Sequence, residues 1–458
     1  MNQGKMAVII IVLLVVTGLA WTYFHCSPFA SCPWSQSTVS KKAKKVTLSF
    51  YGSWDEKGDW EKVIKEFKAQ EKLDRNLDVT IEYKQLDKYN YEDLVYDSLV
   101  NKKGPNIFMM FNSWLPKYQA RLQEMPGAIM TMDQFKANFV PVTADDLTVT
   151  DANTGENKIY SLPLYVDTLA LFYNTTMLYN EGITHPPVDW VQFKDDVEKL
   201  TILDKDGKIT RNGATFGGSK YVNRSQDIVM MMVMQNNTKS DDTRGNLVSF
   251  KTNEAAGAVK LYTDFSDSSN RFYSWDYDSQ IYSIDAFIEG KAAMSMNYSY
   301  DIATIDNKTH GALPYAVTTV PQKYAEDKAN YASYWSPVVA KGADCIKEEG
   351  VTFSCEDISW DFVSFAAQPK NARIYLQKTQ RPAALKLLVE EQMGEVGSKL
   401  APFAEQALTA KSWSNANNKK SDEVLLNMID SVITTDKDKK KTVADAVKLA
   451  ADSVKELN

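Results

Sequence analysis

Residues 160–182 read YSLPLYVDTLALFYNTTMLYNEG, and this stretch predicts how the rest of the chain is organised. Pro163 interrupts any helix near its start, and residues 168–173 form an apolar, β-branched run of the length of a buried strand. Asn174 and Thr175 are candidate caps of a short helix that closes near Gly182. A buried strand in the middle of a long chain can join two halves, or it can be one core strand among many.

Length and composition favour a large globular protein. With 458 residues and 44% hydrophobic content, the chain can bury the core of two domains, or of one bilobed unit with an extension. The net charge is -7, from 52 basic and 59 acidic residues without a dominant basic block, which argues against a nucleic-acid-binding protein. Three histidines and four scattered cysteines leave little room for a zinc or haem site, so we expect no metal and no cofactor.

The N-terminal segment predicts export or membrane attachment. Residues 6–24, MAVIIIVLLVVTGLAWTYF, carry no charge and are long enough for an export signal or a single membrane span. A lipid-modified cysteine needs small residues before it, whereas Cys26 follows Tyr23, Phe24 and His25. We therefore expect residues 1–25 to be an uncleaved anchor of a single-pass cell-membrane protein, with a cleaved signal and a secreted or lipid-anchored form as the alternative.

Residues 26–45 are rich in Ser, Pro and Lys and predict a linker to an extracytoplasmic domain, where disulfides are permitted. Cys345 and Cys355 are close enough in sequence to close a small loop worth about 3 kcal/mol in the chain-entropy model. Two free thiols in a surface loop are the alternative. Cys26 and Cys32 form a second possible pair beside the membrane.

The first folded block alternates strands and helices. We expect strands at 46–54, 77–83 and 107–111, and helices at 60–70 and 91–100. This βαβαβ pattern predicts a parallel sheet covered by helices. Because open α/β sheets bind ligands beyond the carboxyl ends of their strands, the residues that follow two of these strands become candidates. They are Ser53, Trp54 and Asp55 after the first strand and Asn112, Ser113 and Trp114 after the third.

The two tryptophans favour a ligand site. Flat indole faces stack on the apolar faces of sugar rings, while neighbouring carboxylates and amides bond the hydroxyl groups. Either Trp54 or Trp114, taken alone, could equally pack beneath a loop. Their occurrence at two strand ends of one sheet favours a shared cleft.

Several passages resemble one protein family. In the opening stretch and the residues after it, "Tyr-x-x-Pro", an apolar run, "Phe-Tyr-Asn" and then "Gly-Ile…Pro-Pro-x-x-Trp" resemble the crossover segment of the extracellular solute-binding proteins of ABC importers, the maltose-binding-like group. AFIEGKAAMSMNYSYDI at 286–302 resembles the family's passage from a short helix through Gly290 into a strand. SWDFVSFAA and KTQRPAALKLL resemble its later helices. The resemblance covers about residues 46–388.

The resemblance implies a bilobed periplasmic-binding-protein-like fold of type II, with two α/β lobes joined by hinge crossovers and preceded by the N-terminal transmembrane helix. The expected lobe 1 comprises residues 46–161 plus 305–368. The expected lobe 2 comprises 162–304 plus 369–458, including the C-terminal helices.

The resemblance also implies ligand-binding residues in a cleft between the lobes. Tyr298 and Tyr300 align where relatives carry a glycine and a ligand-touching tryptophan, and Tyr334 and Trp335 stand where the family has Gly-Gly. Tyr165 and Asp167 are expected to face the cleft at the hinge, with Leu169, Leu171 and Phe172 supporting them from the cores. Arg381 either reaches the cleft or caps a helix, and the cap is the expectation.

The function implied by the resemblance is capture of a small solute, with a carbohydrate or oligosaccharide as the expected class, for an ABC permease in the membrane. The ATPase would be a separate chain, since no P-loop pattern exists here. One alternative is a tethered adhesion or assembly module. Another is a glycoside hydrolase, although no carboxylate pair stands in a motif that fixes a catalytic distance.

Overall fold

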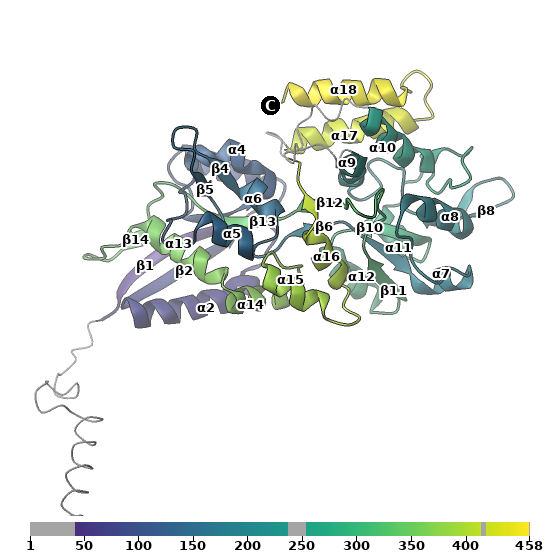
Figure 1. Ribbon diagram of the computed structural model, residues 1–458. Coiled ribbons are helices and arrows are strands. Elements are labelled where there is room, and N and C mark those ends of the chain that lie inside the picture. Colours follow the sequence, from purple (N-terminus) through teal and green to yellow (C-terminus); the bar gives the residue numbers. More distant parts are fainter. Residues whose placement is uncertain (1–41, 237–252, 414–417, 458) are drawn as a thin grey trace, which may run out of the picture.

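The computed structural model describes residues 42–236, 253–413 and 418–457, and it consists of two α/β lobes side by side (Figure 1). The predicted anchor at 1–25, most of the predicted linker and the Cys26–Cys32 pair lie outside the described residues. Within the described ranges, none of the helices is both long enough and apolar enough to cross a membrane.

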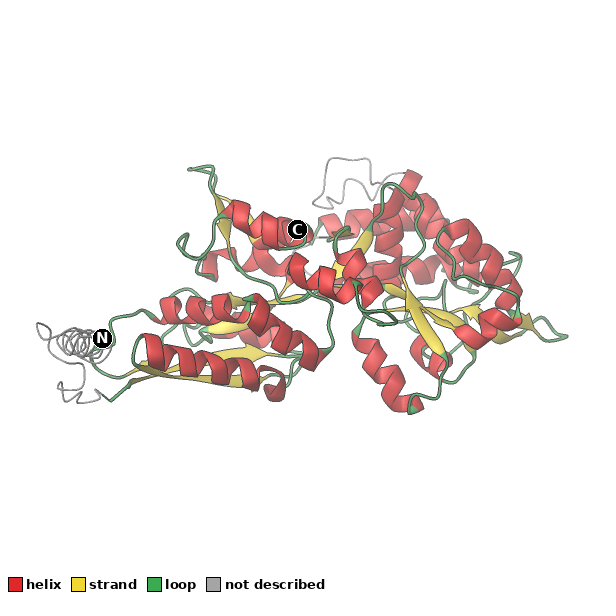
Figure 2. Ribbon diagram, turned by 60° about the horizontal axis from the view of Figure 1, so that its bottom comes forward, coloured by secondary structure: helices red, strands yellow, loops and turns green. Residues whose placement is uncertain are grey.

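Lobe 1 is built on a five-stranded sheet. Its core is the predicted βαβαβ unit, in which β1 pairs in parallel with both β2 and β3. The later strands β13 and β14 add antiparallel to β3 and β1. The strands are β1 Lys44–Gly52, β2 Leu77–Gln85, β3 Ile107–Phe111, β13 Trp335–Val339 and β14 Ile346–Lys347. Helices cover the sheet, as Figure 2 shows.

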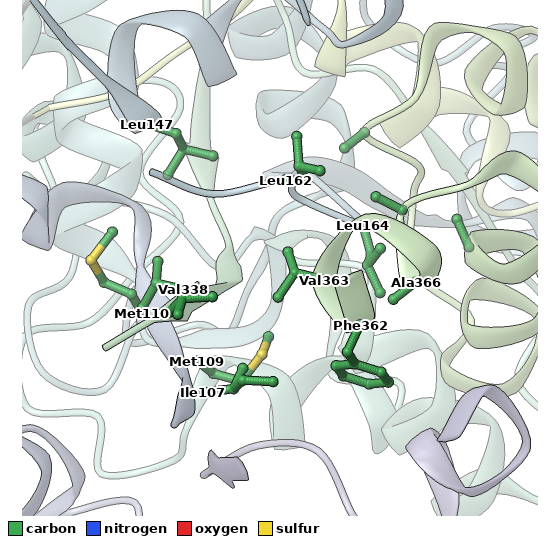
Figure 3. Packing of buried hydrophobic residues seen from close by; sticks show 14 of the residues in the cluster. Ile107, Met109, Met110, Leu147, Leu162, Leu164, Val338, Phe362, Val363 and Ala366 are labelled. Atoms are coloured by element: carbon green, nitrogen blue, oxygen red, sulfur yellow. The ribbon is translucent and has the colours of Figure 1, made fainter. Parts of the chain in front are cut away.

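The lobe 1 helices form where apolar residues recur at helical spacing. In α2, Trp60, Val63 and Phe67 lie on the buried face, and Glu56 and Asp59 make a reciprocal capping box at its start. Figure 3 shows part of the hydrophobic core of lobe 1, in which Leu164 lies near Phe362 of α13. The helices and small strands are α2 Lys57–Asp74, α3 Tyr91–Val100, η1 Asn112–Trp114, α4 Leu115–Tyr118, η2 Gln119–Arg121, α5 Met132–Asn138, α6 Val142–Leu147, β4 Thr148–Thr150, β5 Asn157–Ile159, α13 Cys355–Ala366, α14 Pro369–Thr379 and α15 Lys386–Met393.

Lobe 2 has its own five-stranded sheet, in the order β11-β7-β10-β9-β8. The strands are β7 Ala170–Asn174, β8 Ile202–Leu203, β9 Ile209–Ala214, β10 Ala292–Asn297 and β11 Tyr315–Thr318. The helices are α7 Thr175–Asn180, α8 Trp190–Leu200, α9 Ser225–Asn236, α10 Asn253–Thr263, η4 Asp264–Ser266, α11 Ser283–Ile288, α12 Tyr300–Thr309, α17 Asn418–Ile433 and α18 Val443–Lys455. The C-terminal pair α17 and α18 packs on α9 and α10 (Figure 1).

The opening stretch behaves as the sequence predicts. Residues 162–166 run beside the chain at 381–385, and β7 then enters the lobe 2 sheet between β10 and β11. Asn174 caps α7 by accepting the Met177 N–H at 3.0 Å, and Gly182 follows with a positive φ of 72°. The stretch is therefore the first passage between the lobes.

A small third sheet joins all three passages between the lobes. It contains β6 Asp167–Thr168 from the first passage, β12 Asn330–Ser333 from the second and β15 Ala410–Lys411 from the third. Helix α16, Ala401–Ala407, lies against it. From α16, the buried side chain of Gln406 donates to the Leu169 carbonyl at 2.8 Å and to Thr168 Oγ1 at 3.1 Å, and accepts the Val320 N–H at 2.9 Å.

Three elements lie in the lobe opposite to the one expected from the sequence. One is α15, which falls within the range expected for lobe 2, yet its Leu388 and Val389 belong to the lobe 1 core. Strand β11 falls within the range expected for lobe 1, yet it pairs with β7 in the lobe 2 sheet. Helix α14 falls within the range expected for lobe 2, yet its Tyr375 ring packs 4.7 Å from the Trp60 ring of α2. Strand alternation and helix periodicity identify an element, but they do not specify its partner.

The predicted disulfide is present. Cys345 and Cys355 are bonded, and they tie the loop that carries β14 to the start of α13. Helix α3 turns Tyr91 and Val95 toward the core, whereas Leu94 is 48% exposed.

We predict that Gln406→Leu lowers the free energy of unfolding by about 2 to 4 kcal/mol. The variant keeps most of the side-chain volume but leaves the Val320 N–H and the Leu169 carbonyl without their buried partner. Urea unfolding measures the change. Gln377→Leu, on the exposed side of α14, is the control, and equal effects of the two substitutions would contradict the proposed role of these hydrogen bonds.

Candidate functional site

The lobe 1 side of the junction carries two partly exposed tryptophans. Trp54 follows β1 and is 48% exposed, with the Lys88 ammonium 5.5 Å from its ring centroid. Trp335 begins β13 and is half-buried. Its ring centroid lies 5.1 Å from that of Trp114 and 5.5 Å from that of Tyr91, both edge-to-face. The packed rings hold the Trp335 indole in one orientation.

A buried network connects these two tryptophans. The carboxylate of Asp55, next to Trp54, accepts hydrogen bonds from Trp60 and Tyr375 at 2.9 Å each and pairs with Arg381 at 2.8 Å. The Arg381 guanidinium lies 4.4 Å from the centre of the Tyr165 ring. The Tyr165 hydroxyl in turn accepts the backbone N–H of Trp335 at 3.2 Å.

A second polar cluster lies at the carboxyl end of β3. The Asp146 carboxylate accepts hydrogen bonds from Asn112 at 3.1 Å, Tyr334 at 2.8 Å and Ser412 at 2.6 Å. Burial raises the pKa of Asp146 to about 7, although the three hydrogen bonds lower it. The cluster joins the end of β3 to the second and third passages between the lobes. Asn112, Asp146 and Ser412 also line a pocket of about 540 Å³.

The lobe 2 side presents one exposed tyrosine over a buried one. Tyr300, at the start of α12, is 43% exposed and stacks on buried Tyr298 with centroids 5.8 Å apart. The Tyr298 hydroxyl donates to Asp227 at 2.8 Å. Arg224 Nε donates to the Tyr300 hydroxyl at 3.3 Å, and Arg224 itself has a positive φ of 57°. A non-glycine residue in that conformation is strained and is held there by its surroundings.

Two buried carboxylates lie around this tyrosine pair. Asp167 accepts the Ser299 hydroxyl at 2.7 Å and the Ser299 N–H at 3.2 Å, which ties the first passage to lobe 2. Asp301 lies 3.3 Å from the Asn223 amide nitrogen. Burial raises the pKa of Asp167 and that of Asp301 to about 7, because removal from water disfavours the charged form of each carboxylate.

The predicted site residues divide into two groups. Trp54, Tyr300 and Trp335 present partly exposed rings. The others are buried supports: Asp55, Asn112, Ser113, Trp114, Tyr165, Asp167, Tyr298 and Tyr334. Tyr165 and Asp167 were expected to face the cleft, but they are 4% and 3% exposed and bond to protein groups.

Three charged residues of this region were not among the sequence candidates. Arg381 was expected to cap a helix and instead makes the buried pair with Asp55. Arg224 follows a Val-Asn pair before a methionine-rich helix, and its place at the start of that helix was the available signal. Asp301 is adjacent to Tyr300, and nothing in the sequence distinguishes it from a solvated carboxylate. Among the described residues, no group of His, Cys, Asp and Glu side chains could hold a metal ion.

The fold is similar to those of solved sugar-binding proteins. The cyclic alpha-maltosyl-1,6-maltose binding protein of Arthrobacter globiformis aligns over 90% of this chain and 99% of its own, with a TM-score of 0.68 at 16% identity. The sugar-binding protein MalE of Xanthomonas citri aligns over 90% and 97%, with a TM-score of 0.69 at 15% identity. At such identities the likeness concerns the fold.

Sequence comparison identifies the family. A binding protein of Brucella abortus is 27% identical over 123 residues, and that match spans only 25% of this chain and 28% of the relative. The family model described as "Bacterial extracellular solute-binding protein" matches residues 62–395, well over half of the 458 residues. The chain therefore belongs to the bacterial extracellular solute-binding protein family.

Proposed function

We propose that the protein captures a neutral carbohydrate or oligosaccharide between its two lobes and delivers it to an ABC-type importer. The observation that carries this proposal is the set of three partly exposed rings, Trp54 and Trp335 on lobe 1 and Tyr300 on lobe 2. Polar groups adjoin each ring: Asp55 follows Trp54, Tyr165 bonds the Trp335 backbone and Arg224 bonds the Tyr300 hydroxyl. Such rings stack on sugars, and fixed polar groups orient hydroxyls. Proteins of similar fold bind a cyclic maltosyl-maltose or were solved with acarbose, cycloalternan or tagatose, and they support this ligand class.

Membership of an extracellular family implies that the folded part works outside the cytoplasm. We propose that residues 1–25 anchor it to the membrane and that 26–45 form the tether. We further propose lobe limits that follow the sheets and cores, with β11 assigned to lobe 2 and both α14 and α15 to lobe 1. Because the family consists of binding proteins, the glycoside hydrolase alternative has no support.

The three rings supply the direct test of this proposal. The fragment from residue 42 is titrated calorimetrically with neutral mono- and oligosaccharides, peptides and polyamines. We expect a heat of binding with carbohydrates only, and we expect no hydrolysis product of the bound carbohydrate. Trp54→Ala and Trp335→Ala should each weaken carbohydrate binding by about 1 to 3 kcal/mol, because each removes a stacking surface.

Tyr179→Ala is the matched control, since Tyr179 is 80% exposed on α7 and belongs to none of these clusters. Unchanged affinity in both tryptophan variants would refute the proposed site. If no carbohydrate binds the unmodified protein, the tethered adhesion or assembly module becomes the better interpretation.

Arg381 connects residues that adjoin the two lobe 1 tryptophans. Its guanidinium pairs with Asp55, adjacent to Trp54, and covers Tyr165, which bonds the Trp335 backbone. A buried charge that loses its partner is costly, whereas removal of both charges together costs far less.

We therefore predict that Arg381→Met lowers the free energy of unfolding by about 3 to 5 kcal/mol and that Asp55→Asn in the same chain recovers part of the loss. Urea unfolding of the double-mutant cycle measures the coupling. Arg373→Met is the control: the Arg373–Glu391 pair is exposed, so its loss should cost under about 1 kcal/mol. Strict additivity of the Asp55 and Arg381 substitutions would rule out this coupling.

The raised pKa values predict how stability depends on pH. In the folded state the pKa of Asp301 is about 7 instead of 3.8, so the folded protein keeps a proton that the unfolded chain loses at lower pH. The stability that this group contributes is complete below about pH 4 and is lost as the pH rises through 7.

Asp301→Asn should therefore reduce the fall in the free energy of unfolding between pH 5.5 and pH 8.5, because the amide does not titrate. Urea unfolding at the two pH values gives the difference, with the exposed Asp74→Asn as the control. An undiminished fall in the Asp301 variant would show that another group is responsible.

A further inference from the structure

A pocket of about 630 Å³ opens in lobe 2, apart from the three rings. Its walls come from the turn at 218–221, the loop at 275–280 and one side of α17. None of the eleven site residues predicted from the sequence lines it.

The floor of this pocket is rigid. Trp275 is buried beneath the turn, and a Cβ on Gly218 would lie 2.3 Å from its Nε1, so only glycine leaves the space open. The Gly218 carbonyl accepts the Tyr262 hydroxyl at 2.7 Å. Ser219 donates to the Leu426 carbonyl at 3.0 Å, which fixes the turn to α17. The pocket is therefore formed before any ligand arrives.

The walls offer the groups that bind sugars. The rings of Tyr221 and Tyr277 are half-buried, which leaves one part of each available for stacking. The amides of Gln280 and Asn427 are exposed, and within the described part of the chain neither has a hydrogen-bond partner. Amide groups both donate to and accept from hydroxyls.

The charges at the rim restrict the kind of sugar. Asp278, Glu423 and Asp430 are exposed there, and among the described residues that line the pocket Lys220 is the one cation. The excess of negative charge repels phosphorylated, sulfated or uronic sugars, whereas carboxylates accept hydrogen bonds from neutral hydroxyls.

Short contacts connect the pocket to the lobe 2 cluster. The Tyr221 carbonyl accepts the Ser283 N–H at 2.8 Å, and the Ser283 hydroxyl accepts the Asn223 N–H at 2.7 Å. The Asn223 side chain reaches Asp301, which adjoins Tyr300. Three successive hydrogen bonds within lobe 2 therefore link the wall of the pocket to the residue next to Tyr300.

We propose that this pocket holds the far end of a neutral oligosaccharide whose other end lies on Tyr300. The inference rests on the proposed function and deepens it, since it makes the solute a chain of several units instead of a single sugar. Stacking on Tyr221 and Tyr277 and hydrogen bonds to Gln280 and Asn427 would add affinity only for ligands long enough to reach them.

The test compares ligands of rising length. The unmodified protein and the double variant Tyr277→Ala/Asn427→Ala are titrated with malto-, cello- and xylo-oligosaccharides of one to seven units. We expect the affinity of the unmodified protein for one of these series to rise with length. The double variant should bind the shortest ligand of that series equally well and the longest about 10-fold more weakly. Asn427 is exposed and Tyr277 is half-buried in the pocket wall, so the melting temperature should change little, and Tyr179→Ala is the control.

The outcomes separate the two proposals. If affinity rises with ligand length equally in the unmodified protein and in the double variant, the pocket proposal is wrong but the proposed function stands. Equal weakening for short and long ligands also overturns it, because the residues would then act at the primary site. Absence of binding to every carbohydrate by the unmodified protein overturns the proposed function, and the pocket proposal with it.

Discussion

The side-chain amide of Gln406 is the contact on which the arrangement of the lobes depends. It bonds the backbone of the first passage at Leu169 and that of the second at Val320, while Gln406 itself belongs to the third. Its backbone carbonyl accepts the Asn330 amide of β12 at 3.4 Å, and Gln322 extends the chain of amides by donating to Asn330 Oδ1 at 3.0 Å. Buried amides are costly when unpaired, so such a network is stable in few arrangements. The three passages are therefore fixed to one another at this sheet, and any hinge motion has to be taken up by the residues on either side of it.

The candidate site follows from this constraint, because its supports radiate from the same passages. Tyr165 contacts lobe 1 through Arg381 and Trp335, whereas Asp167, two residues later, bonds Ser299 of lobe 2. One short segment thus positions the Trp335 ring on one side and the Tyr300 neighbourhood on the other. The buried residues near the hinge set the geometry, and Trp54, Tyr300 and Trp335 are the predicted site residues whose rings are partly exposed. Rings held in this way lose little conformational freedom on binding, which favours affinity.

The sequence predicted the elements of this fold better than their partners. The βαβαβ block, the crossing at 168–173 and the Cys345–Cys355 bridge follow from local periodicity, capping and spacing, and all are present. The lobe that receives β11 or α14 depends on contacts between residues far apart in sequence, which periodicity does not contain. The same limit applies to the site. Tyr298 and Tyr300 are equivalent in sequence, but the chain turns into α12 between them, so one ring is 1% exposed and the other 43%. Arg381 and Asp55 are 326 positions apart, and their pairing exists only in the fold.

The Arg224 backbone indicates how the lobe 2 face keeps its shape. Its left-handed conformation costs on the order of 1 kcal/mol for a residue with a side chain, so interactions of the folded protein must compensate. Three contacts of the Arg224 guanidinium offset this cost. It lies 5.7 Å from the centre of the Tyr298 ring and 4.0 Å from Asp227, and it donates to the Tyr300 hydroxyl. These contacts give the Arg224 charge its partners and also fix the positions of the Tyr298 and Tyr300 rings. The interactions that offset the backbone strain are therefore the ones that position the rings. A flexible glycine at this position would relieve the strain but would remove the cation that orients Tyr300. The lobe 2 face therefore keeps its order through an arginine that its own backbone conformation disfavours.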